Sequence, residues 1–145
     1  THFADPVCGK IVKDGKTFMV FGSPGGSRII SIGVQVFLNV VEHGMTIQEA
    51  VNAPRIHHQW LPDQITVEPL ALSADTQVNL EAMGHKIVSQ TVWGAAEAIL
   101  IGPEAGAESA AESSGNDAMA GTVLVPGRLY GGHDDRRPAG SAAGY

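Results

Sequence analysis

Residues 22–28 (GSPGGSR) are the segment of this 145-residue chain whose residue types and spacing are best suited to chemistry. A short apolar stretch, residues 18–21, precedes the segment, and a stretch with helical apolar spacing follows it. Backbone N–H groups at the start of a helix have no intrahelical acceptor and lie at the positive end of the helix dipole. Because glycine has no Cβ, Gly25 and Gly26 would let such N–H groups approach a negatively charged oxygen closely.

Three interpretations of this glycine turn are open from the residues alone. It could bind a phosphate, although it lacks the Gly-Lys-Ser/Thr ending of a P-loop and the spacing of a dinucleotide-binding loop. It could be an oxyanion hole, in which Gly25 and Gly26 stabilise the charge that develops on a carbonyl oxygen. It could also be a tight turn between a strand and a helix, with no chemical role.

Thr1 is a second candidate for chemistry because of its position. An N-terminal threonine carries its own general base, the free α-amine, whose unperturbed pKa is about 7.7–8.0. A hydroxyl and an amine on one residue are the catalytic pair of N-terminal nucleophile hydrolases. The alternative interpretation is that residue 1 only marks where this sequence begins.

The histidines, the cysteine and the tryptophans give no sign of a metal or cofactor site. His57 and His58 are neighbours, and in an extended chain their side chains point to opposite faces. No His-Glu-x-x-His spacing is present, and a lone Cys8 cannot form a cysteine-rich zinc site. Trp60 and Trp93 are expected to be core or interface anchors. We therefore expect no metal and no cofactor.

Composition limits the classes of partner and the number of domains. Asp and Glu number 15 against 9 Lys and Arg, a formal net charge of -6, so a nucleic acid is not an expected partner. No apolar run approaches the roughly 20 residues that cross a bilayer, so no membrane span is predicted. Hydrophobic residues make up 43% of the chain, which favours one packed domain over residues 1–145.

Sequence patterns predict an α+β fold with helices on one face of a largely antiparallel sheet. Asp14-Gly15 predicts the two-residue turn of a β-hairpin over residues 10–21. The remaining predicted elements are helices at 30–43, 47–53 and 75–83 and strands at 65–68, 86–92, 95–101, 123–125 and 129–130, with 55–64 irregular.

Two further segments are expected to lie at the surface. Residues 102–121 are rich in Gly, Ala, Ser and Glu, so residues 104–127 are predicted to be a flexible insertion in the domain. Residues 134–137 (DDRR) are expected to form a solvated charged turn, in which an arginine could pair with an acidic group of a partner.

Six motifs along the chain form one recognisable set. They are residues 22–30 (GSPGGSRII), 38–44 (LNVVEHG), 48–63 (QEAVNAPRIHHQWLPD), 80–85 (LEAMGH), 135–138 (DRRP) and the final Gly144-Tyr145. Together they resemble the small subunit of the γ-glutamyltransferase (γ-glutamyltranspeptidase) family, over about residues 11–103 and 128–145. The run HHQWLPD is the most specific of them and favours this family over the related cephalosporin acylases.

The resemblance implies a fold, an activity and a partner. It implies the C-terminal part of an αββα N-terminal nucleophile hydrolase sandwich, in a precursor that cleaves itself ahead of a threonine. That threonine attacks the γ-carbonyl of glutathione or another γ-glutamyl compound, and the γ-glutamyl ester passes to water, an amino acid or a dipeptide. It also implies a large subunit from the same precursor, a periplasmic or extracellular location, and an oxyanion hole at Gly25 and Gly26.

Two questions stay open after the resemblance. Thr1 matches either the nucleophile or the threonine that follows it in the family. Residues 4–10 match none of the family's substrate-binding segment. The chain is therefore either a catalytic small-subunit chain or a catalytically incomplete fragment that serves only in subunit packing.

Overall fold

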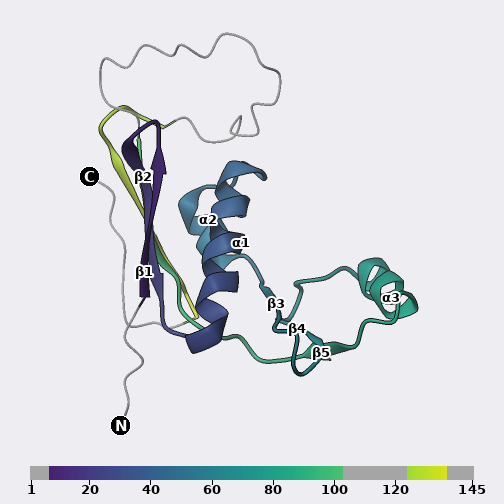
Figure 1. Ribbon diagram of the computed structural model, residues 1–145. Helices are drawn as coiled ribbons and strands as arrows, with labels where there is room; N and C mark the ends of the chain where they lie inside the picture. Colours follow the sequence, from purple (N-terminus) through teal and green to yellow (C-terminus); the bar gives the residue numbers. More distant parts are fainter. Residues whose placement is uncertain (1–6, 103–123, 137–145) are drawn as a thin grey trace.

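The computed structural model describes residues 7–102 and 124–136 (Figure 1). Thr1 and all but the last four residues of the predicted insertion at 104–127 lie outside these ranges. The body of the described chain is an antiparallel sheet of four strands in the order β1-β2-β6-β7. Its strands are β1 (Val7–Lys13), β2 (Lys16–Ser23), β6 (Glu97–Ile101) and β7 (Leu129–His133).

The predicted hairpin is confirmed as β1 and β2. Its two turn residues, Asp14 and Gly15, have φ angles of 51° and 78°. Positive φ at both central positions is the requirement of the tight turn that the Asp-Gly pair predicts. The turn therefore sets the register that places Met19 of β2 in the core, where it is fully buried.

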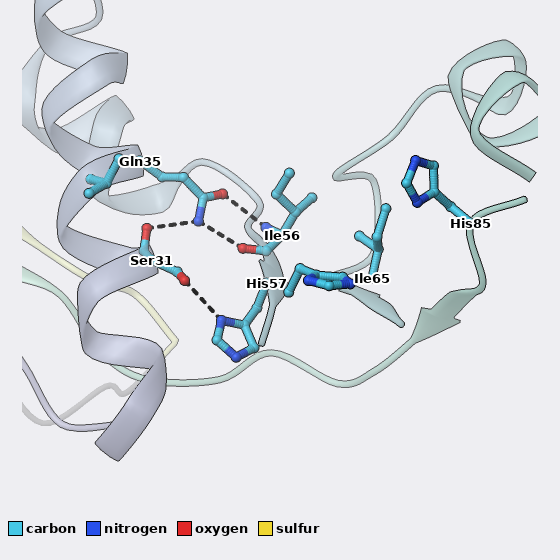
Figure 2. A pocket seen from close by; sticks show the side chains of 8 residues that line it. Ser31, Gln35, Ile56, His57, Ile65 and His85 are labelled. Atoms are coloured by element: carbon cyan, nitrogen blue, oxygen red, sulfur yellow. Dashed lines mark hydrogen bonds between the residues drawn. The ribbon is translucent and has the colours of Figure 1, made fainter. Parts of the chain in front are cut away.

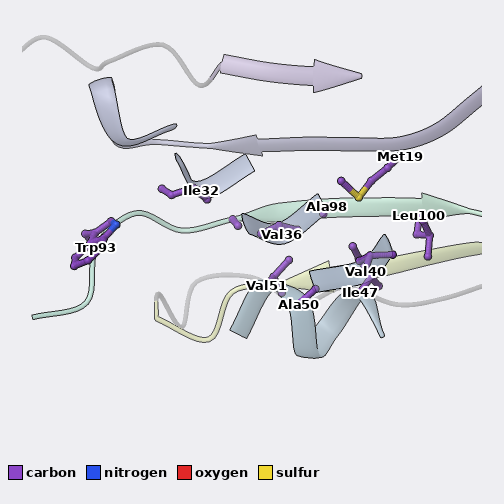
Figure 3. Packing of buried hydrophobic residues seen from close by; sticks show 11 residues of the cluster. Met19, Ile32, Val36, Val40, Ile47, Ala50, Val51, Trp93, Ala98 and Leu100 are labelled. Carbon is purple, nitrogen blue, oxygen red and sulfur yellow. The ribbon is translucent and has the colours of Figure 1, made fainter. Parts of the chain in front are cut away.

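Two helices cover one face of this sheet (Figure 1). A short 3-10 helix, η1 (Gly26–Arg28), leads into α1 (Ile29–Val41), and α2 (Ile47–Asn52) follows after a turn. Figure 3 shows side chains from these helices packed against the sheet in one cluster. Its buried members are Met19, Ile32, Val36, Val40, Ile47, Ala50, Val51, Trp93, Ala96, Ala98 and Leu100. The α+β prediction, with helices on one face of an antiparallel sheet, is confirmed.

The helix caps follow the sequence closely. The Thr46 side chain accepts a hydrogen bond from the backbone N–H of Glu49, and the Glu49 carboxylate accepts one from the N–H of Thr46. This reciprocal pair satisfies two N–H groups that a helix start leaves without acceptors. At the start of α3 (Ala74–Ala82) the Ser73 side chain makes one cap bond, which it accepts from the backbone N–H of Thr76.

A smaller sheet of three strands lies beside the body, with α3 at its far side (Figure 1). It is ordered β3 (Ile56–His58), β4 (Ile65–Val67) and β5 (Ile87–Ser89), with β4 and β5 parallel. The prediction that residues 55–64 are irregular is wrong for β3, which pairs with β4. A strand of three residues is too short to show alternation in a sequence.

The segment between β5 and β6 also differs from expectation. Strands were predicted over 86–92 and 95–101, but residues 90–96 are not in a strand, although the Gln90 N–H still donates to the Val67 carbonyl of β4 at 2.9 Å. The backbone N–H groups of Trp93 and Ala96 donate instead to the buried carboxylates of Glu68 and Asp134. In this segment, side-chain carboxylates therefore accept the hydrogen bonds that the backbone of a neighbouring strand would accept in a sheet. Residues 124–125 of the predicted strand at 123–125 are not in a strand either, and Val123 lies outside the described residues.

No helix within residues 7–102 and 124–136 is long and apolar enough to cross a membrane.

Candidate functional site

The glycine turn lies between a strand and a helix, as predicted. Strand β2 ends at Ser23, and η1 begins at Gly26. Gly25 has a φ of 148° and Gly26 a φ of 58°, values that residues with a side chain rarely adopt. A Cβ built on Gly26 would meet no atom within 4 Å, so the space beside this backbone is open.

The hydrogen bonds that begin the helix leave the glycine N–H groups available. The first bonds run from the N–H of Arg28 to the carbonyl of Gly25, at 3.2 Å, and from the N–H of Ile29 to the carbonyl of Gly26. The N–H groups of Gly25 and Gly26 come before the first donor, so they have no acceptor within the helix. Two such donors at the start of α1 can stabilise a negatively charged oxygen.

The described chain also contains a cluster of buried charges that the sequence did not reveal. Arg55, Asp134 and Glu68 are 1%, 0% and 2% exposed, and the side chain of Arg136 is 9% exposed. Arg55 Nη2 lies 2.7 Å from Asp134 Oδ2, and Arg136 bridges Asp134 Oδ1, at 2.9 Å, and Glu68 Oε2, at 2.6 Å. We call these four residues the buried ion network.

The buried ion network corrects one prediction. Residues 134–137 were expected to form a solvated turn, but Asp134 is fully buried and Arg136 lies in the network. Arg137 lies outside the described residues. The two arginines pair with acids of their own chain, 68 and 79 residues away. Sequence patterns report neighbours along the chain, so no local signal could have identified these pairs.

Opposite charges and hydrogen bonds outweigh the effect of burial on the pKa values of Asp134 and Arg136. Burial alone would raise the pKa of Asp134, but hydrogen bonds from the Ala96 N–H, Arg136 and Arg55 outweigh burial and hold the pKa below its ordinary 3.8. Burial alone would lower the pKa of Arg136, yet Glu68 and Asp134 raise it overall. For Arg55, burial is the larger effect and lowers the pKa.

A groove of about 390 Å³ lies on the other side of α1, between this helix and the smaller sheet (Figure 2). Ser31 Oγ lies 2.9 Å from His57 Nδ1 there, and His57 Nε2 faces Gln59 Oε1 at 3.2 Å. A catalytic serine–histidine pair needs a group that stabilises the protonated imidazole, and a neutral amide oxygen serves this purpose poorly. We interpret this pair as a structural link between α1 and β3.

The other sequence-predicted residues are placed as follows. His57 is buried and His58 is exposed, which confirms that they face opposite sides. Trp93 is buried in the core as expected, whereas Trp60 is 77% exposed. Within residues 7–102 and 124–136, no group of three or more His, Cys, Asp or Glu side chains could hold a metal ion. Thr1 lies outside these residues.

Comparisons with known proteins connect this geometry to one family. A family profile described as gamma-glutamyltranspeptidase matches residues 6–122. Two curated relatives, both named glutathione hydrolase proenzyme, come from Pseudomonas sp. (strain A14) and Escherichia coli (strain K12). They are 42% and 41% identical over 135 residues, 93% of this chain. The chain spans about a fifth of the length of these relatives, 21% and 19%.

Solved structures agree with the sequence comparisons. The fold is similar to that of the gamma-glutamyltranspeptidase T380A mutant from Helicobacter pylori, with a TM-score of 0.71 and 37% identity over 93% of this chain and 62% of that one. It is also similar to the Pseudomonas nitroreducens gamma-glutamyltranspeptidase complexed with L-DON, with a TM-score of 0.67 and 29% identity over 97% of this chain and 63% of that one. These likenesses confirm the α+β class and the N-terminal nucleophile hydrolase fold.

Proposed function

Because this chain belongs to the gamma-glutamyltranspeptidase family, we propose that it is part of an enzyme that hydrolyses or transfers γ-glutamyl groups. In this proposal the donor is glutathione or a related γ-glutamyl compound, and the acceptor is water, an amino acid or a dipeptide. The chain contributes the C-terminal part of a small subunit and pairs with a large subunit from the same precursor. The assembled protein works in the periplasm or outside the cell.

The observation that carries the proposal is the turn at Gly25 and Gly26. Hydrolysis and transfer of a γ-glutamyl group both pass through tetrahedral intermediates that bear a negatively charged oxygen. The two glycine N–H groups, open to a ligand at the start of α1, would donate hydrogen bonds to that oxygen. The arrangement suits a carbonyl oxygen better than a phosphate because the turn carries no lysine.

We assign the nucleophile to Thr1. Its hydroxyl would attack the γ-carbonyl while its α-amine takes the proton, and the protonated amine would then give that proton to the departing amine. The product of this step is a γ-glutamyl ester on Thr1. Water or an acceptor amine then attacks the ester, loses its proton to the same α-amine, and regenerates the threonine hydroxyl.

The proposed function is tested in the full-length precursor by release of an aniline from a γ-glutamyl anilide. Gly26→Val should reduce kcat about 10²- to 10³-fold, the loss expected when one oxyanion donor is displaced. Gly15→Val is the matched control, because Gly15 also has a positive φ and open space around it but lies in the hairpin turn. The Gly15→Val enzyme bears similar backbone strain and should keep the turnover of the wild type.

Three results would contradict the proposal or a part of it. Equal turnover in Gly26→Val and Gly15→Val would remove the oxyanion role from the turn. No turnover in the wild-type precursor would favour the alternative, a catalytically incomplete chain that serves only in subunit packing. Turnover that persists in Thr1→Ala would move the nucleophile to another residue.

A further inference from the structure

We propose that Ser23 is a positioning residue, which orients the Gly25 N–H for catalysis and is itself held by a segment that the buried ion network fixes. The proposal rests on the oxyanion role proposed above for the glycine turn. It assigns a role to a side chain outside the motif's two glycines, and it gives the buried charges a purpose in the site.

Two peptide planes of the turn carry the N–H groups of Gly25 and Gly26. In a planar trans peptide the C=O and N–H point in opposite directions, so fixing one end fixes the other. The Gly25 carbonyl accepts from the N–H of Arg28, which fixes the plane that carries the Gly26 N–H. No helical bond reaches the preceding plane, which carries the Pro24 carbonyl and the Gly25 N–H.

Ser23 supplies the missing constraint. Its hydroxyl donates to the Pro24 carbonyl at 2.8 Å, so it fixes the peptide plane whose other end is the Gly25 N–H. The same oxygen accepts from the backbone N–H of Ala95 at 3.4 Å. Ser23 is 2% exposed, so water cannot easily take the place of either partner.

The segment on which Ser23 rests is packed directly against the same peptide. Gly94 has a φ of 71°, and a Cβ on it would lie 2.6 Å from Ile32 Cδ1, 3.2 Å from Ser23 Oγ and 3.4 Å from the Pro24 carbonyl oxygen. A glycine is therefore required there. The close approach means that a displacement of this segment is transmitted to Ser23 and Pro24.

The buried ion network fixes this segment on both sides of Gly94. The N–H of Trp93 donates to Glu68 Oε1 at 2.9 Å, and its carbonyl accepts from Arg55 Nη1 at 3.2 Å. The N–H of Ala96 donates to Asp134 Oδ2 at 2.9 Å. Hydrogen bonds to ionised groups are roughly twice as strong as neutral ones, so this support is rigid.

The far end of the turn is attached to the same support. The Arg28 guanidinium lies over the Trp93 ring, 4.9 Å from its centroid, and donates to Gln90 Oε1 at 2.9 Å. The turn is therefore held at its start through Ser23 and at its end through Arg28. Both attachments are made to residues 90–96.

The test compares Ser23→Ala with Ser73→Ala in the full-length precursor. Both remove a serine hydroxyl that bonds to backbone, but Ser73 caps α3 and lies far along the chain from the turn. Ser23→Ala should lower kcat/KM for a γ-glutamyl anilide about 10- to 100-fold, less than the loss of a whole donor. Ser73→Ala should keep the wild-type value.

A second measurement separates positioning from stability. A boronic acid in place of the γ-carboxyl of glutamate forms a negatively charged tetrahedral adduct with a hydroxyl nucleophile, whereas glutamate itself forms none. In Ser23→Ala the affinity for the boronate should fall in proportion to kcat/KM, and the affinity for glutamate should stay unchanged. The added Cβ of Gly94→Ala would contact Ser23 Oγ and the Pro24 carbonyl oxygen, so this variant should show the same pattern of affinities. It replaces Ser23→Ala in the test if Ser23→Ala does not fold.

Each outcome decides between the two proposals. Wild-type turnover together with a Ser23→Ala value within twofold of it would overturn the positioning role alone. Equal losses of affinity for the boronate and for glutamate would also overturn it, because a general disturbance of the site would then explain the result. An inactive wild-type precursor would overturn the proposed function, and this inference with it.

Discussion

Replacing Asp134 by alanine should be among the most destabilising single changes in the described part of the chain. Within the described part of the chain, Asp134 accepts four hydrogen bonds, from Arg55 Nη2, the Ala96 N–H, and the N–H and Nη1 of Arg136. In the buried ion network two positive groups balance two negative ones. Removal of Asp134 leaves one positive charge in excess at a place where Arg55 is 1% exposed.

The size of the effect follows from that imbalance. Breaking a buried ion pair by removal of one partner costs about 3–5 kcal/mol, because the remaining charge stays buried without compensation. Asp135 offers a matched control next to it. It is exposed, and among the described residues its carboxylate accepts one hydrogen bond, from Asn52 Nδ2 at 2.6 Å. Loss of that bond in Asp135→Ala should cost about 0.5–1.5 kcal/mol.

The measurement is urea-induced unfolding of the full-length protein with each variant. For a slope of about 2 kcal/mol per M, a loss of about 4 kcal/mol lowers the midpoint by about 2 M. Asp135→Ala should lower it by less than half as much. Equal shifts for the two variants would refute the reasoning, because the balance of buried charge would then contribute nothing beyond an exposed hydrogen bond.

Two other predictions concern stability. Because the pKa of Asp134 is held below 3.8 in the folded state, its ionised carboxylate contributes fully to the free energy of unfolding at pH values above 3.8, and this contribution is lost as the pH falls through the lower folded-state pKa. The stabilities of wild type and Asp134→Asn should therefore converge at low pH in acid unfolding. Stability curves that stay parallel would contradict this. A Cβ on Gly132 would lie 2.8 Å from the Ile47 carbonyl oxygen, so Gly132→Ala should push α2 away from β7 and lower the free energy of unfolding by about 1–3 kcal/mol. Thermal unfolding measures the effect, and an unchanged melting temperature would refute the close contact.

The features that the sequence predicted correctly are those determined by a few neighbouring residues. Asp14-Gly15 specifies its turn because both residues tolerate positive φ, and Thr46 with Glu49 specifies a helix start because the bonds close within four residues. The strand-to-helix turn at Gly25 was predicted for the same reason. The residues alone left its chemical role open, since an oxyanion hole and a plain turn require the same glycine geometry. The oxyanion role was predicted only from the family resemblance.

The features that it did not predict depend on residues far apart in the chain. Strand β3 exists because β4 pairs with it, and three residues carry too little pattern to reveal that. Asp134 and Arg136 look like a surface turn until Arg55 and Glu68 are placed beside them. Their charges predicted that these side chains would be exposed to solvent. The fold instead brings opposite charges together, and this pairing makes their burial possible.

The buried ion network also has a consequence for the order in which the protein can mature during synthesis. Arg55 and Glu68 leave the ribosome well before Asp134 and Arg136, which are among the last described residues to be made. Until those two arrive, the hairpin and α1 can form, but residues 93–96 lack the hydrogen bond from the Ala96 N–H to Asp134. The glycine turn can therefore reach its final geometry only after Asp134 and Arg136 have been made, so a nascent chain carries this turn well before the support of the turn is complete.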